Sequence, residues 1–273
     1  MNCTRRNFLI GGSTTLFLSG FFPKLSFASM QKKNLIIISP LIDTKSKMNR
    51  KIKAEKIGLL LDELYPSTPT PLDHTDSYTL IVAVMLSAQT TDKKVNQVTP
   101  ALFAQADSPE KMARLPVEKI QGLIREIGLA PTKAKNLKKM AKQLIENGGL
   151  RPDWDYLESL AGVGHKTASV VMAQWYKIPA FPVDTHIHRL ASRWGLSKSK
   201  NVEMTEKDLK LLWNKKSWNR RHLQIIFFGR EHCPARNHDM KKCLICSWAS
   251  TKKRMLQELK IQSSKYKKQI KRN

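Results

Sequence analysis

Residues 160–168 read Leu-Ala-Gly-Val-Gly-His-Lys-Thr-Ala, with Gly162 and Gly164 between two segments of helical pattern. Glycine lets a turn adopt positive φ and lets backbone N–H groups come close to an anion. The helix after the turn adds the partial positive charge of its N-terminus. The stretch therefore predicts a helix–hairpin–helix unit, from helices over 154–161 and 166–176, that holds a phosphate group.

Two side chains with acid–base chemistry accompany this turn. Lys166 opens the second helix, and Asp184 stands at the start of a later predicted helix, in Val-Asp-Thr-His. A neutral amine is a nucleophile, and a helix N-terminus with nearby cations disfavours its charged form. Asp184 can cap its helix and can also stabilise positive charge or relay protons. The pair predicts a nucleophile with an acid/base partner, and a plain phosphate-binding lysine is the alternative.

The composition indicates a polyanionic partner. Lys and Arg number 48 against 22 acidic residues, which gives a formal net charge of +26. Such an excess favours nucleic acid as the partner, and a binding protein without chemistry is the alternative that it leaves open. No run of eighteen or more apolar residues follows Met48, so no membrane span is expected there.

The chain after Met48 has the pattern of an all-α protein, without a convincing set of alternating strands. The segment 77–88 is apolar on nearly all sides, which suits a buried central helix. Thr205 to Asp208 resembles a capping box that opens a helix. The tail from Thr251 has nine basic residues and one acidic residue, which predicts a frayed helix or a disordered arm. Further helices are expected over 53–64, 133–146, 184–194 and 220–228, with helix starts near 109 and 117.

The first 47 residues allow two interpretations. Arg5 and Arg6 precede a weakly apolar stretch and a small-x-small sequence at residues 26–28, which resembles a twin-arginine export signal. The favoured interpretation is that translation starts at Met48, where a charged and then helical sequence begins. Both interpretations treat residues 1–47 as an extension outside the fold.

Four separated motifs resemble the endonuclease III family of helix–hairpin–helix DNA glycosylases, over roughly residues 48–248. They are Leu-Ser-Ala-Gln-Thr-Thr-Asp at 86–92, Ile-Gly-Leu-Ala-Pro-Thr-Lys-Ala at 127–134, the hairpin at 160–168 and Val-Asp-Thr-His at 183–186. The resemblance implies two helical lobes with DNA in the cleft between them. One lobe is a helical barrel over 69–180, the other combines 48–68 with 181–250, and 251–273 is a basic tail.

The resemblance also implies an activity in base-excision DNA repair. Such a bifunctional glycosylase and AP lyase removes oxidised pyrimidines from double-stranded DNA and cleaves the strand 3′ to the abasic site through a lysine imine. Lys166 is the implied nucleophile and Asp184 its partner. We expect a monomer that acts on damaged bases or abasic sites, in the cytoplasm if translation starts at Met48, with export by the twin-arginine-like signal as the alternative. A monofunctional relative, such as an adenine glycosylase, and a noncatalytic DNA-binding module are the alternatives.

The same resemblance assigns residues to DNA contact. Gln89 and Leu129 would fill the hole left by a flipped nucleotide, although Leu129 could instead be a hydrophobic staple after Gly128. His165 stands where many relatives have arginine, so we expect a weaker phosphate contact. His186 is either a supporting, DNA-contacting residue or a structural histidine. Phosphate contacts are expected along the hairpin from Gly162, Val163, Gly164, His165 and Thr167.

The cysteines depart from the family pattern. Most members hold a [4Fe–4S] cluster with C-x6-C-x2-C-x5-C, whereas this chain has Cys233-x9-Cys243-x2-Cys246, and Lys252 takes the fourth position. His238 lies midway between the first two cysteines and could complete a zinc site. A cluster with one ligand other than cysteine and a metal-free loop held by packing of Trp248 are the alternatives.

No cofactor is expected to be required for the chemistry, so any metal would be structural. In each case the loop would present positive charge to the DNA backbone, through Arg236, Lys241 and Lys242.

Overall fold

The computed structural model of the protein describes residues 49–270. The predictions made for residues 1–47, an export signal or a start at Met48, lie outside the described residues. Every regular element between residues 49 and 270 is a helix, which confirms the all-α prediction. No helix in this range is long and apolar enough to cross a bilayer.

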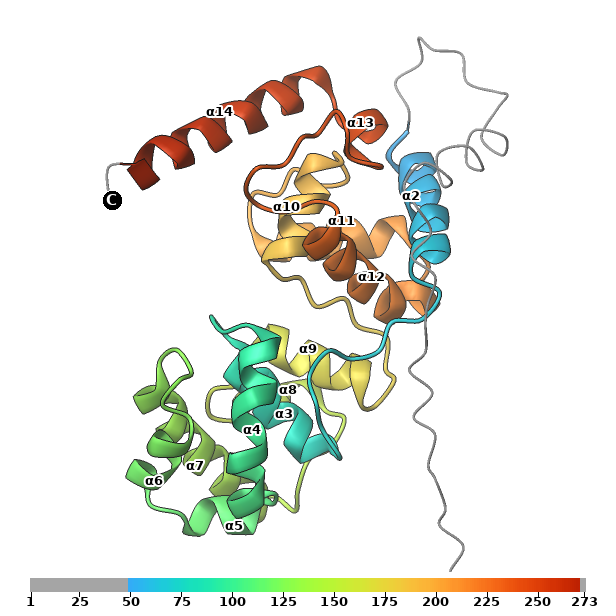
Figure 1. Cartoon of the computed structure of the whole chain (residues 1–273). Coiled ribbons are helices and arrows are strands. Elements are labelled where there is room, and N and C mark those ends of the chain that lie inside the picture. Colours follow the sequence, from blue (N-terminus) through green and yellow to red (C-terminus); the bar gives the residue numbers. More distant parts are fainter. Residues whose placement is uncertain (1–48, 271–273) are drawn as a thin grey trace, which may run out of the picture. The chain divides into compact units, whose positions relative to one another are not determined.

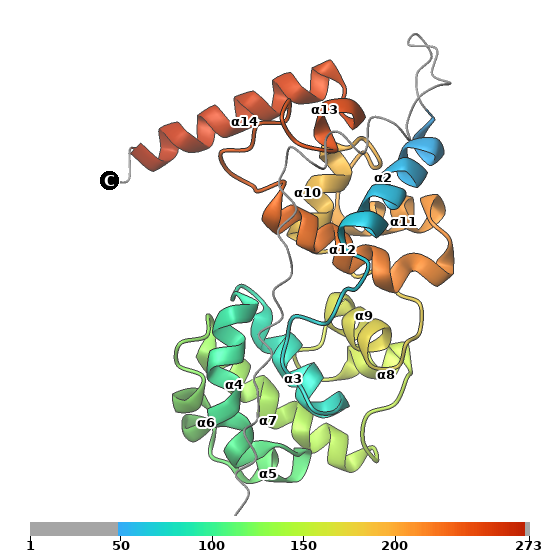
Figure 2. The same ribbon diagram turned by 45° about the vertical axis from the view of Figure 1, so that its right-hand side comes forward.

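The helices form two groups (Figures 1 and 2), and each group surrounds its own cluster of buried side chains. The first core takes its residues from Leu72 to Ala180. It is built by α3 (Ser77–Ser87), α4 (Asp92–Ala106), α5 (Pro109–Arg114), α6 (Val117–Leu123), α7 (Ala130–Glu146), α8 (Trp154–Ser159) and α9 (His165–Gln174).

The second core combines residues 54–61 with residues 181–249. Its elements are α2 (Arg50–Leu64), α10 (Thr185–Arg193), α11 (Val202–Leu212), the 3₁₀ turn η1 (Lys215–Ser217), α12 (Trp218–Glu231), α13 (Cys246–Ala249) and α14 (Lys252–Ile270). Helix α2 packs against α11 and α12, so the start of the described chain completes a core that is otherwise built by its end (Figure 1).

Helix α3 is the central helix that the sequence predicts. Asp76 begins it with a capping box, because its carboxylate accepts from the Thr79 N–H while the Thr79 hydroxyl accepts from the Asp76 N–H. Residues 78–86 are all buried, and the helix contacts α4, α7 and α9. Each large aliphatic side chain buried there contributes about 1.5–3 kcal/mol, so this apolar helix organises the first core.

Two helix assignments differ from the sequence patterns. The capping box predicted at Thr205 is wrong, because α11 starts at Val202 and is capped by Asn201, whose side chain accepts from the Met204 N–H at 2.8 Å. Thr205 is buried inside the helix, and its hydroxyl donates to the Asn201 carbonyl. Helix α4 is not predicted by the patterns, since it carries a proline in its interior, Pro100.

The basic tail forms a helix over its described part, α14. Glu258 on α14 is buried and pairs with the buried Arg193 of α10, and Arg254 pairs with the same carboxylate. An unpaired buried charge costs several kcal/mol of stability, so the buried Arg193 needs the Glu258 carboxylate beside it. The first turns of α14 are therefore attached to the second core.

Asn219 at the start of α12 joins the two cores. Its side-chain amide donates to the Ala173 carbonyl at 3.0 Å, and its side-chain oxygen accepts from the Ala180 N–H at 2.9 Å. A second link is the ion pair between Arg230 and Asp92, at 2.6 Å. The contacts of Asn219 hold the end of α9 and the segment that leads from it to α10, whereas the ion pair joins α12 to α4.

Candidate functional site

The two glycines of the turn between α8 and α9 have different surroundings. Gly162 has a φ of +79°, and a β-carbon added there would lie 2.6 Å from Cε of Met85. Gly164 is the N-cap of α9 with extended backbone, and a β-carbon there would meet nothing within 4 Å. Val163 between them is buried in the first core and donates to the Leu160 carbonyl. Gly162 thus serves the packing of the turn, whereas Gly164 leaves its surface open to a ligand.

Helix α9 begins beside this open surface. Lys166 is the second residue of the helix, and its side chain is exposed. Thr167 follows it and is half-buried. No side chain caps the N-terminus of α9, so the N–H groups of its first turn are not taken up in that way. Such a helix start attracts anions, so this feature supports the hairpin's phosphate contact, which stays a prediction.

Asp184 is the N-cap of α10, one of the two roles considered for it. Its Oδ1 accepts from the Ile187 N–H at 2.8 Å, and the residue is half-buried. Oδ2 takes no part in this cap. The cap fixes the rotamer of the carboxylate, so its second oxygen has a defined direction.

The charges of Lys166 and Asp184 both act on His222, a residue that the sequence patterns do not single out. His222 lies on α12 and is 2% exposed. Burial lowers the pKa of His222 to about 4, although the Asp184 carboxylate opposes this shift and the Lys166 charge adds to it. Such effects require the charges to lie near the ring, since charge interactions weaken with distance. The structure therefore brings the two candidate catalytic residues into one neighbourhood.

Gln89 and Leu129 are both exposed residues with positive φ, of 59° and 62°. Their loops lie side by side, because the Gly128 N–H donates to the Thr90 hydroxyl at 3.3 Å. A left-handed conformation in residues other than glycine costs about 1 kcal/mol or more and often marks a functional loop. Leu129 is 56% exposed, so the alternative of a hydrophobic staple is wrong.

Lys133 holds these loops in place, although the sequence patterns do not single it out. Its ammonium donates to the carbonyls of Leu86 and Ala88, at 2.8 and 2.6 Å, where α3 ends. The side chain is buried, and this burial lowers the pKa of Lys133. Because Lys133 lies one turn after Leu129 on α7, it connects the base of one loop to the base of the other. The motif at 127–134 contains this lysine, which is the signal that could have identified it.

His165 faces two carboxylates. Its Nδ1 lies 2.8 Å from Glu158 and its Nε2 lies 3.1 Å from Glu206, while the ring stacks on Trp154. Burial lowers the pKa of His165, but the hydrogen bond with Glu158 and the charge of Glu206 outweigh it, and the net pKa is raised. The ring is thus held at the hairpin by protein partners.

His186 has mainly structural contacts. It is half-buried, its Nδ1 lies 3.2 Å from the Arg189 guanidinium, and its ring packs on Gly229. Burial lowers the pKa of His186, although the charge of Asp184 opposes this shift. These contacts favour the structural interpretation of this histidine and leave it two residues from Asp184.

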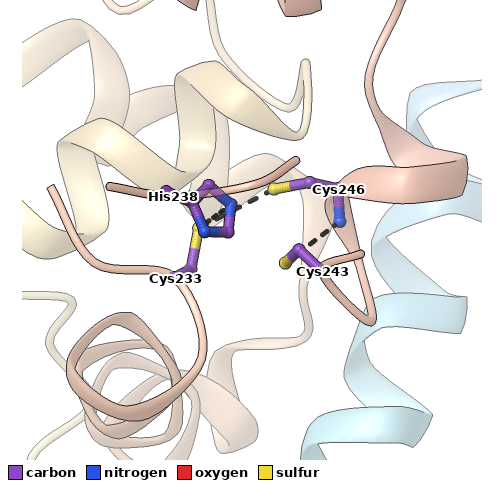
Figure 3. A group of neighbouring side chains, drawn as sticks. All are labelled: Cys233, His238, Cys243 and Cys246. Atoms are coloured by element: carbon purple, nitrogen blue, oxygen red, sulfur yellow. Dashed lines mark hydrogen bonds between the residues drawn. The ribbon is translucent and has the colours of Figure 1, made fainter. Parts of the chain in front are cut away.

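The predicted metal-ligating residues meet in the second core (Figure 3). Cys233, His238, Cys243 and Cys246 are all buried, and one ligand atom from each lies within 4.8 Å of the others. Hydrogen bonds with the other two thiols lower the pKa of Cys243. These four residues could therefore hold a metal ion.

The position of Trp248 does not match the alternative in which its packing holds a metal-free loop. Trp248 is 38% exposed, and its indole donates to the Leu244 carbonyl, so it does not fill the centre of the loop. Arg236, Lys241 and Lys242 are exposed, as a role at the DNA backbone requires. The cluster thus lies beneath a surface that carries positive charge.

The chain is similar to known proteins of DNA repair. A model of the HhH-GPD superfamily of base excision DNA repair proteins matches residues 82–215. Endonuclease III of Bacillus subtilis (strain 168) is 41% identical over 196 residues, which are 71% of this chain and 88% of that protein.

Two solved structures are also similar. One is a trapped endonuclease III–DNA covalent intermediate, with a TM-score of 0.70 and 36% identity over 72% of this chain and 94% of that chain. The other is a non-covalent endonuclease III–DNA complex, with a TM-score of 0.72 and 36% identity over 77% of this chain and 100% of that chain.

Proposed function

Because the chain belongs to the endonuclease III family, we propose that it is a base-excision repair enzyme, a DNA glycosylase with AP lyase activity that acts on oxidised pyrimidines. The observation that carries this proposal is the exposed amine of Lys166 at the uncapped start of α9. The charges of Lys166 and Asp184 both act on the buried ring of His222, which indicates that the two residues are near each other. A hairpin that only binds DNA needs neither an amine nucleophile nor, beside it, a carboxylate held in place by capping a helix.

The reaction divides into two steps at Lys166. The neutral amine attacks C1′ of the nucleotide, a C–N bond forms, and the bond from C1′ to the base breaks with the electron pair leaving on the base. The nitrogen then loses a proton, the C1′–O4′ bond breaks with its electron pair on O4′, which takes up a proton, and a protonated imine forms between Lys166 and C1′. A proton is then lost from C2′, a double bond forms between C2′ and C3′, and the C3′–O bond breaks with the phosphate as leaving group. The strand is thereby cleaved on the 3′ side of the lesion.

Asp184 has two tasks in this scheme. Its Oδ1 remains in the cap of α10, and its Oδ2 stabilises positive charge at the sugar and exchanges protons with the amine. The related endonuclease III that was trapped as a covalent intermediate with DNA supports a covalent step in this family.

Access to C1′ requires the nucleotide to leave the helix. We assign Gln89 and Leu129 to filling the space that it leaves, because both are exposed on adjacent loops with positive φ. DNA then lies across two lobes, the barrel of residues 69–180 and a second lobe of residues 48–68 and 181–250. The hairpin holds a phosphate through its backbone, with Gly162, Val163, Gly164, His165 and Thr167 at the contact and His186 in support.

The substrate is double-stranded DNA, bound by a monomer. The net charge of +26 favours this partner and makes the affinity dependent on salt. An enzyme of this kind has its substrate at the chromosome, so we place its action in the cytoplasm.

The test is an imine trap on the full chain. Borohydride is added to the protein with duplexes that carry thymine glycol or an abasic site, and Lys166→Gln and Lys139→Gln are run alongside. Lys139 is an exposed lysine on α7 between Asn136 and Gln143, which contact the hairpin, so its variant removes the same charge close to the hairpin without removing the candidate nucleophile. We expect a covalent protein–DNA band in the wild type and in Lys139→Gln, and none in Lys166→Gln.

Other outcomes separate the alternatives. Base release without a covalent band would indicate a monofunctional glycosylase. Binding of DNA without either reaction would indicate a noncatalytic module, and a band that persists in Lys166→Gln would identify another amine as the nucleophile.

A further inference from the structure

The donor atoms of the cysteine cluster do not fit the group that the family resemblance implies. A [4Fe–4S] cluster is held by four thiolates. This chain supplies three, from Cys233, Cys243 and Cys246, and position 252, where a fourth is expected, is an exposed lysine at the start of α14. The fourth buried donor is instead the imidazole of His238. Three sulfurs and one nitrogen form a set that zinc commonly takes.

The distances in the cluster distinguish one metal ion from four. In a four-iron cluster each thiolate binds a different iron, which holds the sulfurs roughly 6 Å apart. All four donor atoms here lie within 4.8 Å of one another. A tetrahedral zinc ion with Zn–S bonds of about 2.3 Å places two sulfurs about 3.8 Å apart, and a sulfur and a nitrogen about 3.5 Å apart. Cys233 Sγ lies 3.7 Å from Cys246 Sγ and 3.3 Å from His238 Nε2.

We therefore propose that Cys233, His238, Cys243 and Cys246 form a tetrahedral site for a single zinc ion, which takes the place of the iron–sulfur cluster in this chain. The two close cysteines support this geometry, because the Cys246 N–H points at Cys243 Sγ with a distance of 3.5 Å. Backbone N–H groups that point at a thiolate stabilise its negative charge when it binds a cation.

The residues around the cluster match its charge. One Zn²⁺ with three thiolates and a neutral imidazole has a net charge of about −1. Arg193 is fully buried and donates to Cys233 Sγ at 3.2 Å and to the carbonyls of Cys233 and Pro234. Glu258 of α14 holds this guanidinium in place. Such partners around the ligands orient them and tune the metal site.

The site joins parts of the second core that are separated along the chain. Cys233 follows the end of α12, His238 and Cys243 lie in the loop, and Cys246 starts the four-residue helix α13. A bound ion joins them in one unit, so metal binding contributes directly to the stability of this region. The role is structural and does not depend on the proposed reaction at Lys166.

Metal content of the full chain is the first measurement. The protein is purified without oxygen from cells supplied with both iron and zinc, and zinc, iron and acid-labile sulfide are quantified per chain. We expect one zinc ion, no iron and no sulfide. Iron with an equal amount of sulfide would overturn the proposal, and so would a chain that carries neither metal after this treatment.

Two variants test the histidine ligand. His238→Ala should weaken zinc binding at least about 100-fold in competition with a chromophoric chelator. The matched control is His232→Ala, since His232 is partly exposed beside Cys233 and is not one of the four donors. Equal affinities in the two variants would overturn the assignment of His238.

Cobalt substitution keeps the test valid if His238→Ala does not fold. Co²⁺ in the wild-type site should give the visible absorption bands of a tetrahedral ion. In His238→Cys a fourth thiolate replaces the nitrogen, and the sulfur-to-cobalt absorption should rise by about one third. An unchanged spectrum would show that position 238 does not reach the metal.

Discussion

At the hairpin, Lys166 and Gly164 are exposed, and the turn owes its shape to glycine and to a helix start. At the cysteine cluster, Cys233 and Cys246 are fully buried, and side chains contribute every donor atom. The hairpin can therefore lose a side chain and keep its shape, whereas the cluster cannot. The comparison separates residues needed for the reaction from residues needed for the fold, and it leads to four predictions.

The largest effect on stability is expected for Cys233→Ser. The hydroxyl is a poor zinc ligand and leaves Arg193 without the sulfur that it contacts. We expect the free energy of unfolding to fall by about 3 kcal/mol or more, measured in urea.

Lys166→Gln is the matched comparison from the hairpin. Its side chain is exposed, so the free energy of unfolding should change by less than about 0.5 kcal/mol while imine trapping is lost. Equal destabilisation of the two variants would mean that the cluster does not hold its region together.

The next effect separates the two glycines. Gly162→Ala combines positive φ with a contact of 2.6 Å to Met85, so we expect a loss of about 2–3 kcal/mol in unfolding free energy. Gly164→Ala has room for its methyl group and should stay within about 0.5 kcal/mol.

Gly164→Ala, the more stable of these two variants, should still bind DNA more weakly than the wild type. The methyl group of Gly164→Ala would stand where the phosphate approaches, so we expect about tenfold weaker binding to an abasic-site duplex in a titration. Unchanged affinity of this stable variant would exclude Gly164 from the phosphate contact.

The contrast between the two regions also explains what the sequence could predict. The hairpin was visible because its signals are local: glycines, a lysine and a helix start within nine residues at 160–168. The cap at Asp184 and the buried helix α3 are local signals too, and the structure confirms both. The all-α fold follows from the repetition of such patterns.

The remaining features depend on distant contacts. Lys133 and His222 act through residues on other helices, so their types and neighbours in sequence give little indication of their roles. His222 stands in the run Arg220-Arg221-His222, which has the pattern of a surface, yet tertiary packing buries it. The sequence shows three cysteines and one histidine at a spacing that indicates a metal, and the distances among Cys233, His238 and Cys246 add the second ground for one ion over a cluster.

The third prediction concerns acid and tests whether His222 stays neutral near the hairpin. The pKa of His222 is about 4 in the folded protein and 6.5 in an unfolded chain. The unfolded chain therefore binds a proton that the folded protein does not, and stability is lost as the pH falls from about 6.5 toward 4. Between neutral pH and about pH 5, we expect protonation of His222 in the unfolded chain to lower the free energy of unfolding by about 2 kcal/mol.

The control is His222→Gln, which has no proton to bind. Urea unfolding is measured for both proteins at the two pH values, so that the contribution of His165, whose raised pKa has the opposite sign, cancels. The variant should lose less stability than the wild type on acidification. Equal losses would mean that His222 becomes protonated in the folded protein and that its neighbourhood is more polar than its burial indicates.

The smallest effect is expected for Lys133→Met, which tests whether the two loops act together. Methionine keeps the length and apolar stem of the side chain but leaves the carbonyls of Leu86 and Ala88 without their donor, at a cost of about 1 kcal/mol. Gln89 and Leu129 then lose a common support, so base release should slow about tenfold, because misplaced groups near the reacting centre cost rate. Lys135→Met, from an exposed position on the same helix, is the control. If Lys133→Met lowered stability but left base release unchanged, the loops would hold their positions through Gly128 and Thr90 alone, and Lys133 would belong with the cysteine cluster among residues that serve only the fold.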